Sequence, residues 1–228
     1  MSLVNNHPIT SLVNGGTLPT GAAGFPTANL EAHYKFNTGI TVTGAGVSEW
    51  QDQTANNRHL LQGTDTNRPA ESSGIITFDG VDNYLDVTGG FTLVQPTTVY
   101  ILFKQITWSN NDRIFDGEVG PKILYQNATT PGIKLYAGAG TTQNDNMTLG
   151  TYFAVASIFD GASSTIKVGA TAESTGNAGT GDMGGFILGA QATGNANWSN
   201  IAVKEVLIYS VAHDDTVRQQ VITYLDTI

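Results

Sequence analysis

Apolar residues occur along most of the chain in short runs that turn residues separate. The runs are Ala32–Phe36, Ile75–Phe78, Tyr84–Val87, Val99–Ile106, Ile123–Tyr125, Ile133–Tyr136, Tyr152–Phe159, Thr165–Val168, Phe186–Leu188 and Ile201–Tyr209. The turn dipeptides between them include Asp79-Gly80, Asp116-Gly117 and Asp160-Gly161. Short strands at close spacing, separated by such turns, predict an all-β sandwich or barrel.

Two runs, Val99–Ile106 and Tyr152–Phe159, are apolar at both odd and even positions. Successive side chains of a strand point to opposite faces, so such a strand is buried on both faces. We therefore expect both runs to lie in the middle of a sheet.

At the C-terminus the apolar period becomes that of a helix. The stripe consists of Val217, Val221, Tyr224, Leu225 and Ile228. Asp214 can accept hydrogen bonds from the free N–H groups of the first turn, and Asp215 favours the positive end of the helix dipole. We expect a single amphipathic helix that packs on a sheet and carries no chemistry.

Residues 1–29 differ from the rest of the chain because prolines and glycines interrupt them too often for a regular element. Pro8, Pro19 and Pro26 are the prolines of this segment. It is predicted to be an arm before one domain at 30–228, either a linker or an extended strip lying on that domain.

Composition changes the picture mainly at the surface. Charged residues make up 13% of the chain, against ~25% in an ordinary soluble protein. The formal net charge of −9 shows no basic footprint for nucleic acid. No apolar run is long enough to span a membrane, and the absence of cysteine excludes disulfides and thiolate metal sites. No signal peptide is recognisable at the N-terminus.

Several motifs together carry a family resemblance. They are Trp50-Gln51-Asp52, then Phe78-Asp79-Gly80-Val81-Asp82-Asn83-Tyr84-Leu85, then Glu205-Val206-Leu207-Ile208-Tyr209 and the final helix. In this order they resemble the laminin-G-like domains of the concanavalin-A-like jelly-roll superfamily, in its bacterial and phage branch. The likeness covers roughly residues 30–228. The sequence departs from the family where Thr54-Ala55-Asn56-Asn57 replaces the usual Ser-Gly-Asn-Gly, and where Val217 replaces a glutamate.

The resemblance implies a two-sheet antiparallel jelly-roll sandwich. Members of the family are commonly accessory or adhesive modules that bind carbohydrate. A fold does not fix a function, so this implication is an analogy.

Calcium is the metal that the sequence allows, because Asp and Asn oxygens cluster at several turns. Laminin-G-like domains often bind calcium at a loop edge. Asp79, Asp82 and Asn83 are the first choice of ligands because they lie on the most family-like motif. The alternative is that these residues only stabilise turns through bonds to their own backbone.

A saccharide site needs an aromatic platform with polar groups converging on hydroxyls. The loop residues Trp108, Asn110, Asn111, Asp112 and Arg113 supply both. Tyr125 and Tyr136 would join them if they point to the same groove. The alternative is that Trp108 folds back over the sheet edge and that both tyrosines are ordinary sheet packing. Trp50 and Trp198 match positions that the family buries.

No catalytic residues are assigned. Jelly-roll glucanases usually carry Glu-x-Asp-x-x-Glu on one strand, and no glutamate of this chain begins that spacing. The four histidines are interpreted as structural or surface groups. Glu205 lies within the apolar run Val203–Tyr209, so we expect it to be partnered by Arg58, Arg113 or a buried backbone amide.

The sequence therefore predicts a non-enzymatic module that binds a glycan or cell-surface polysaccharide, outside the cell or on a virion such as a phage tail. Calcium would be a structural cofactor, and the arm would mediate any homo-oligomer. Alternatives are an assembly module without a small ligand and a polysaccharide-degrading enzyme with an unrecognised site.

Overall fold

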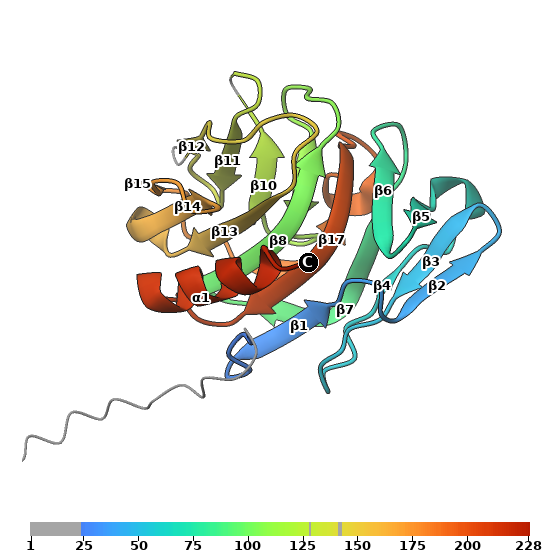
Figure 1. Ribbon diagram of the computed structural model, residues 1–228, viewed down its shortest axis with the longest axis horizontal. Coiled ribbons are helices and arrows are strands. Elements are labelled where there is room, and N and C mark those ends of the chain that lie inside the picture. Colours follow the sequence, from blue (N-terminus) through green and yellow to red (C-terminus); the bar gives the residue numbers. More distant parts are fainter. Residues whose placement is uncertain (1–23, 128, 141–142) are drawn as a thin grey trace, which may run out of the picture.

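The protein consists of two antiparallel sheets that pack face to face, with a single α-helix on one side (Figure 1). The computed structural model describes residues 24–127, 129–140 and 143–228. This architecture confirms the predicted all-β sandwich with one C-terminal helix. Most of the predicted arm, and any oligomer contact made through it, lies outside the described residues.

The first sheet has the strand order β15-β14-β13-β8-β17-β6-β5, and β1 also pairs with β17. Its strands are β1 (Leu30–Tyr34), β5 (Ala70–Ser72), β6 (Ile75–Asp79), β8 (Thr97–Gln105), β13 (Phe153–Phe159), β14 (Ser164–Val168), β15 (Ser174–Gly176) and β17 (Asn200–Tyr209). The neighbours β8 and β13 lie in the middle of this sheet, as their apolar runs predict.

The second sheet has the strand order β12-β11-β10-β9-β16-β7-β4-β3-β2. Its strands are β2 (Ile40–Thr43), β3 (Gly46–Trp50), β4 (Leu60–Leu61), β7 (Leu85–Leu93), β9 (Arg113–Asp116), β10 (Ile123–Gln126), β11 (Ile133–Tyr136), β12 (Gln143–Asn144) and β16 (Met183–Leu188). Short 3₁₀ helices occupy Asp65–Asn67, Gly161–Ser163 and Ala192–Gly194.

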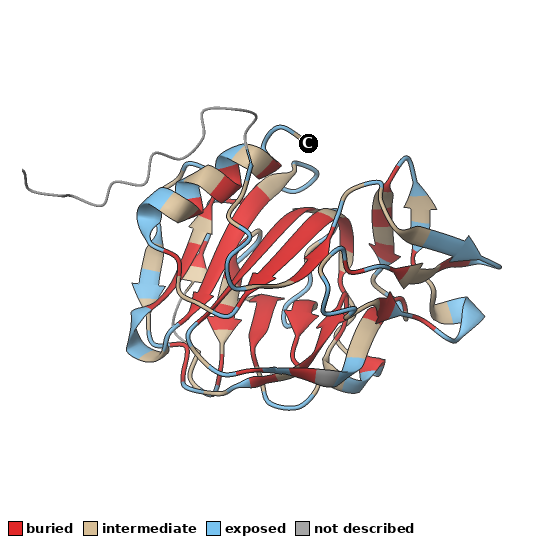
Figure 2. Ribbon diagram, turned by 90° about the horizontal axis from the view of Figure 1, so that it is seen from below, coloured by how far each residue is buried: buried red, intermediate tan, exposed pale blue. Residues whose placement is uncertain are grey.

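Figure 2 shows the buried residues concentrated in the strands of both layers. The main core lies between the sheets and includes Trp50, Phe103, Phe115 and Phe186. Alternation sends the other side chains of each strand to the outer faces. What covers those outer faces therefore distinguishes the two sheets.

Helix α1 (Asp215–Leu225) covers part of the outer face of the first sheet (Figure 1). The backbone N–H of Val217 donates to the side chain of Asp214, which confirms the predicted cap. Helix residues form a second apolar cluster with Tyr100, Ala156 and Leu207, together with further strand and helix side chains. The double burial of β8 and β13 thus comes from the core on one face and helix α1 on the other.

Glu205 is buried completely, with an exposed fraction of 0%, and joins three elements. Its Oε1 lies 2.8 Å from His33 Nε2 on β1 and accepts from the Tyr224 hydroxyl on α1 at 2.7 Å. Its Oε2 accepts from the backbone N–H of Phe36. A backbone amide is therefore one of its partners, as expected, whereas His33 and Tyr224 take the place of the expected arginine.

The end of the N-terminal segment packs beside this network. The Phe25 ring contacts the rings of His33 and Tyr224, with centroids 4.9 and 4.8 Å away. The hydroxyl of Tyr209 donates to the carbonyl oxygen of Pro26. Phe25 and Pro26 thus lie against the domain, and a turn at residues 28–29 leads from them into β1.

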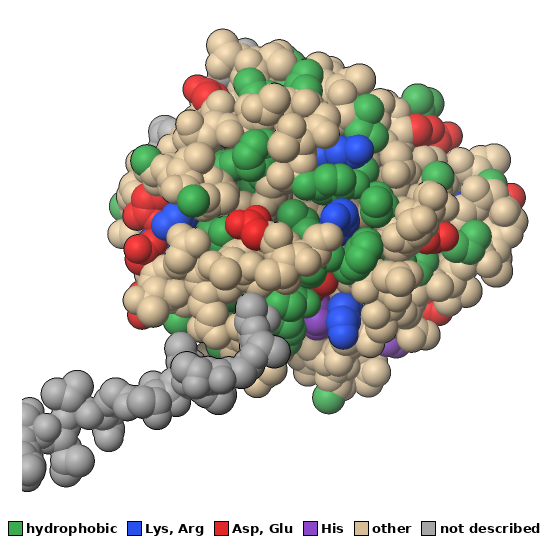
Figure 3. Space-filling view, in the orientation of Figure 1, with side chains coloured by type: hydrophobic (Ala, Val, Ile, Leu, Met, Phe, Trp, Pro, Cys, Tyr) green, Lys and Arg blue, Asp and Glu red, His purple; other side chains and the backbone are tan. Residues whose placement is uncertain are grey.

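Figure 3 shows the helix-bearing face, on which charged side chains take up a small part of the surface and hydrophobic side chains surround basic ones near its centre. No helix in the described part of the chain is both long enough and apolar enough to cross a membrane.

The Glu205 network makes a stability prediction. Glu205→Leu removes the buried acceptor that His33, Tyr224 and the Phe36 N–H share and is expected to lower the free energy of unfolding by about 3 kcal/mol. Urea unfolding followed by circular dichroism measures the change. Glu49→Gln, at a half-exposed position of β3, serves as the control and is expected to change stability by less than about 0.5 kcal/mol. Equal effects of the two substitutions would contradict the structural role of Glu205.

Candidate functional site

The outer face of the second sheet carries the candidate site. On β10 and β11, Leu124 and Leu135 point into the core. Alternation therefore places Ile123, Tyr125 and Tyr136 on the opposite face. Among the described residues, helix α1 contributes to the apolar cluster on the first sheet and not to the core cluster that contains Leu124 and Leu135.

Strand register brings these side chains together. Tyr125 pairs with Lys134 on β11 and with Arg113 on β9, and Ile123 pairs with Tyr136. The Arg113 guanidinium carbon lies 4.8 Å from the centroid of the Tyr125 ring. Tyr125 is only 8% exposed, so its ring serves as a floor on which the guanidinium rests.

A row of acidic side chains continues from this group across the sheet. Ile187 on β16 pairs with Asp116 of β9 on one side and with Asp86 of β7 on the other. The chain after β9 folds back, and Val119 exchanges two backbone hydrogen bonds with Gly184 of β16. This return places Glu118 close enough to Asp86 to help raise the pKa of its carboxyl, after the larger effect of burial.

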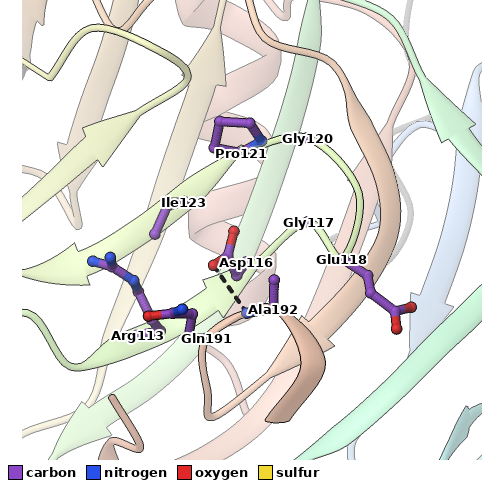
Figure 4. A pocket seen from close by; sticks show the side chains of 9 residues that line it. All are labelled: Arg113, Asp116, Gly117, Glu118, Gly120, Pro121, Ile123, Gln191 and Ala192. Atoms are coloured by element: carbon purple, nitrogen blue, oxygen red, sulfur yellow. Dashed lines mark hydrogen bonds between the residues drawn. The ribbon is translucent and has the colours of Figure 1, made fainter. Parts of the chain in front are cut away.

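Two adjoining hollows, of about 290 and about 250 Å³, open on this face and share Arg113 and Ile123. The first, shown in Figure 4, is lined by Arg113, Asp116, Gly117, Glu118, Gly120, Pro121, Ile123, Gln191 and Ala192. The second is lined by Asn111, Arg113, Ile123, Tyr125 and Tyr136. We call the two together the Arg113 hollow.

Two polar atoms at this hollow are buried without a hydrogen-bond partner, Asp116 Oδ1 and Arg113 Nε. Asp116 is 3% exposed, and its other oxygen accepts from the backbone N–H of Ala192 at 3.1 Å. Burial raises the pKa of Asp116 to about 6, although the Ala192 N–H and the Arg113 charge act against this. Burial lowers the pKa of Arg113, and Asp116 counteracts that effect. Buried polar atoms usually have partners, so a polar ligand or water is expected here.

The structure brings four of the residues predicted from the sequence to one hollow, and three others do not line it. Asn111, Arg113, Tyr125 and Tyr136 line one hollow. The residues that do not line it are Trp108, Asn110 and Asp112.

Trp108 is half-buried, and its indole N–H donates to the carbonyl oxygen of Gly132 at 3.0 Å. It is therefore tied to the loop before β11. Burial raises the pKa of the nearby Asp112 to about 6. Trp50 is fully buried, whereas Trp198, expected in the core, is only partly buried.

The proposed calcium ligands form a turn between β6 and β7. Oδ1 of Asp79 accepts from the backbone N–H groups of Val81 and Asp82, and the Asn83 amide donates to Asp82. These bonds are those of the turn alternative. Within the described ranges, no group of three or more histidine or carboxylate side chains is arranged to hold a metal. Calcium binding at Asp79, Asp82 and Asn83 stays a prediction.

Sequence reasoning missed Asp116, Glu118 and Gln191. Asp116-Gly117 was interpreted only as a turn signal, whereas Asp116 is the last residue of β9 and turns its carboxyl to the outer face. Gln191 comes from a loop far along the chain. The available signal was the adjacency of Asp116 to the apolar pair Ile114-Phe115, which marks the end of a buried strand.

Comparison with known proteins finds structures with a similar fold but no family with a similar sequence. No family model matches the chain, and no curated protein matches it. Laminin-G-like membership therefore stays a prediction.

Several solved structures are similar. Trypanosoma rangeli sialidase in complex with sialic acid has a TM-score of 0.62 and 14% identity, over 89% of this chain and 33% of its own. Domain 4 of AbnA, a GH43 extracellular arabinanase from Geobacillus stearothermophilus in complex with arabinotriose, has a TM-score of 0.55 and 16% identity, over 85% and 98%. An arabinofuranosidase complexed with arabinofuranosyl-alpha-1,2-xylobiose has a TM-score of 0.59 and 12% identity, over 78% and 50%. The chain thus spans about a third of the sialidase's length.

These structures overturn the expectation that the chain is not an enzyme. That expectation rested on a missing glucanase motif and on the resemblance to accessory modules. The similar structures instead belong to glycoside hydrolases. At these identities the likeness shows the fold alone, and it assigns no reaction to this chain.

The raised pKa of Asp116 makes a pH prediction. The folded protein holds this proton up to a pH of about 6, whereas the unfolded chain loses it near the ordinary value of 3.8. The contribution of Asp116 to the free energy of unfolding therefore falls as pH rises through this window. Asp116→Asn, which mimics the protonated acid, is expected to stabilise the protein by about 1–2 kcal/mol at pH 8 and to change little at pH 4.

Urea unfolding at both pH values measures this difference. Asp160→Asn, at an exposed turn position, is the control and is expected to have the same small effect at both. A destabilisation by Asp116→Asn at pH 8 would contradict the assignment of Asp116 as a buried acid with a raised pKa.

Proposed function

We propose that the protein binds carbohydrate in the Arg113 hollow. The observation that carries the proposal is the Arg113 guanidinium, which lies over the Tyr125 ring in a hollow that Asp116 also lines. A sugar presents both an apolar ring face and hydroxyls that donate and accept. The hollow supplies both kinds of partner in one place.

The apolar part of the hollow comes from Tyr136, Tyr125 and Ile123, which line its second half. Against them the C–H face of a pyranose or furanose ring can pack. The Arg113 guanidinium is a donor to a sugar hydroxyl, and the Asp116 carboxyl lines the first half of the hollow. Gln191 lines the first half of the hollow and Asn111 the second, and both carry side-chain amides.

The similar structures support this proposal at the level of the fold. Two of them contain arabinose-based oligosaccharides, and a third contains sialic acid. Calcium as a structural cofactor and a setting outside the cell or on a virion are further proposals from the sequence.

A glycan array with and without calcium tests the function. Wild-type protein is expected to bind a subset of oligosaccharides, and Tyr136→Ala is expected to weaken that binding at least ~10-fold, because it removes the apolar contact. Tyr152→Ala, a partly buried tyrosine at the first sheet, is the matched control and is expected to bind as wild type. Absence of any glycan signal from folded protein would refute the proposal and favour an assembly module.

Glycoside hydrolysis is a second candidate, favoured by one observation. Asp116, whose pKa is raised to about 6, lines the same hollow as a second carboxylate, Glu118. Hydrolysis of a glycosidic bond requires an acid that is protonated near working pH and a second carboxylate that is ionised. Asp116 would be the proton donor and Glu118 the base or nucleophile.

Release of reducing ends from arabinan, xylan and sialylated oligosaccharides tests this candidate. If it is correct, the wild-type protein releases sugars, and Asp116→Asn lowers the rate at least ~10²-fold while oligosaccharide binding persists. Glu173→Gln is the control and should retain full activity, because Glu173 does not line the hollow and instead pairs with Arg218 of α1. Wild-type protein that binds sugars but never cleaves them would remove this candidate and leave the binding function in place.

A further inference from the structure

We propose that the ligand of the Arg113 hollow carries a carboxylate, so that the site takes acidic sugars such as uronic or nonulosonic acids. The inference rests on the proposed carbohydrate-binding function and names its substrate class. Arg113 is the residue assigned to the sugar carboxylate.

The first argument is the state of the arginines. Arg58, Arg68 and Arg218 each form an ion pair, with Glu31, Asp65 and Glu173 at 2.6–2.7 Å. The fourth arginine, Arg113, has no ion pair and no side-chain hydrogen bond among the described residues. The chain has 19 Asp and Glu against 10 Lys and Arg, so acidic partners are in excess. Arg113 lacks an ion pair although acidic residues outnumber basic ones, so we infer that its guanidinium binds an acceptor from a ligand.

The second argument is the position of the guanidinium. Its carbon lies over the Tyr125 ring, and a guanidinium held over an aromatic ring can still donate from the N–H groups along its edge. A carboxylate accepts two parallel hydrogen bonds from this edge, and charge-assisted bonds are roughly twice as strong as neutral ones. A neutral hydroxyl offers a single oxygen, which cannot match this pair of parallel bonds.

The third argument is the charge of the neighbouring strand. Lys134 pairs with Tyr125 and shares its face of the sheet, and no ion pair of Lys134 exists in the described part of the structure. The two cations lie on either side of Tyr125 along this row of the sheet. Asp116 and Glu118 lie in the other half of the Arg113 hollow. The half that contains Tyr125 and Tyr136 therefore carries more positive charge than the half with Asp116 and Glu118, although the charges of Asp116 and Asp112 both act on Arg113.

The two halves fit one acidic sugar unit in a chain. The carboxylate binds Arg113, the ring face rests on Tyr136 and Ile123, and the remaining hydroxyls face Asp116. This arrangement gives the Arg113 guanidinium a carboxylate partner, which no ion pair in the described part of the chain supplies.

Paired probes test the inference by isothermal titration calorimetry. The probes are trigalacturonate with its carboxyl-reduced counterpart galactotriose, and 3′-sialyllactose with lactose. The acidic member of at least one pair is expected to bind ~10-fold or more tightly than the neutral member, with affinity falling as salt rises. Arg113→Gln is expected to abolish this preference, and Arg113→Lys is expected to retain part of it.

Arg68→Gln is the matched control, since it makes the same change in net charge away from the hollow and is expected to keep the preference. Circular dichroism confirms that each variant is folded. Equal binding of acidic and neutral members overturns the inference while the proposed function stands. Loss of preference in Arg68→Gln as well would also overturn it, because net charge alone would then explain the effect. No binding of any probe, and no signal on a wider glycan array, overturns the function itself.

Discussion

A two-sheet sandwich has two outer faces, and this chain places its α-helix on only one of them. On the first sheet, apolar side chains of β8, β13 and β17 are buried under α1. The helix is held there by apolar contacts and by Glu205, whose buried carboxylate ties β1, β17 and α1 together. The cost of burying that charge is offset by three hydrogen-bond donors. Part of the outer face of the first sheet is thus buried in contacts that stabilise the fold.

The outer face of the second sheet is free of this constraint and carries different residues. Here loops after β9 and β16 reach over the strands and partly bury Arg113 and Asp116, without giving them full sets of partners. Partial burial is what gives such groups strength toward a ligand, because water no longer competes fully for their hydrogen bonds. The same burial raises the pKa of Asp116 to about 6. The Arg113 hollow therefore lies on the outer face that helix α1 does not cover.

Much of this fold was predictable because its signals are local. The double burial of β8 and β13 follows from their apolar runs, and the Asp214 cap and apolar stripe define α1. The β2–β3 hairpin was not predictable from an apolar run. Its two strands, Ile40–Thr43 and Gly46–Trp50, mix polar and apolar residues, and β2 is mostly exposed at the edge of the sheet. The partners of Glu205 were missed in part because His33 and Tyr224 meet it only through long-range pairing.

The candidate site was predictable only in fragments for the same reason. Arg113, Tyr125 and Tyr136 could be named from their types, but strand register decides that they share a face. Trp108 had the most suggestive type, yet its indole N–H is bound to Gly132. Asp116 resembled a turn residue because the glycine after it signals a turn, and the return of the following loop cannot be read from adjacent residues.

The most direct test of this account is to map ligand contact by amide chemical shifts during titration with trigalacturonate. The account predicts that the perturbed amides cluster on β9, β10 and β11, around Arg113, Ile123, Tyr125 and Tyr136. Perturbations confined to the β6–β7 turn at Asp79–Asn83, or to the helix-bearing face of the first sheet, would contradict it.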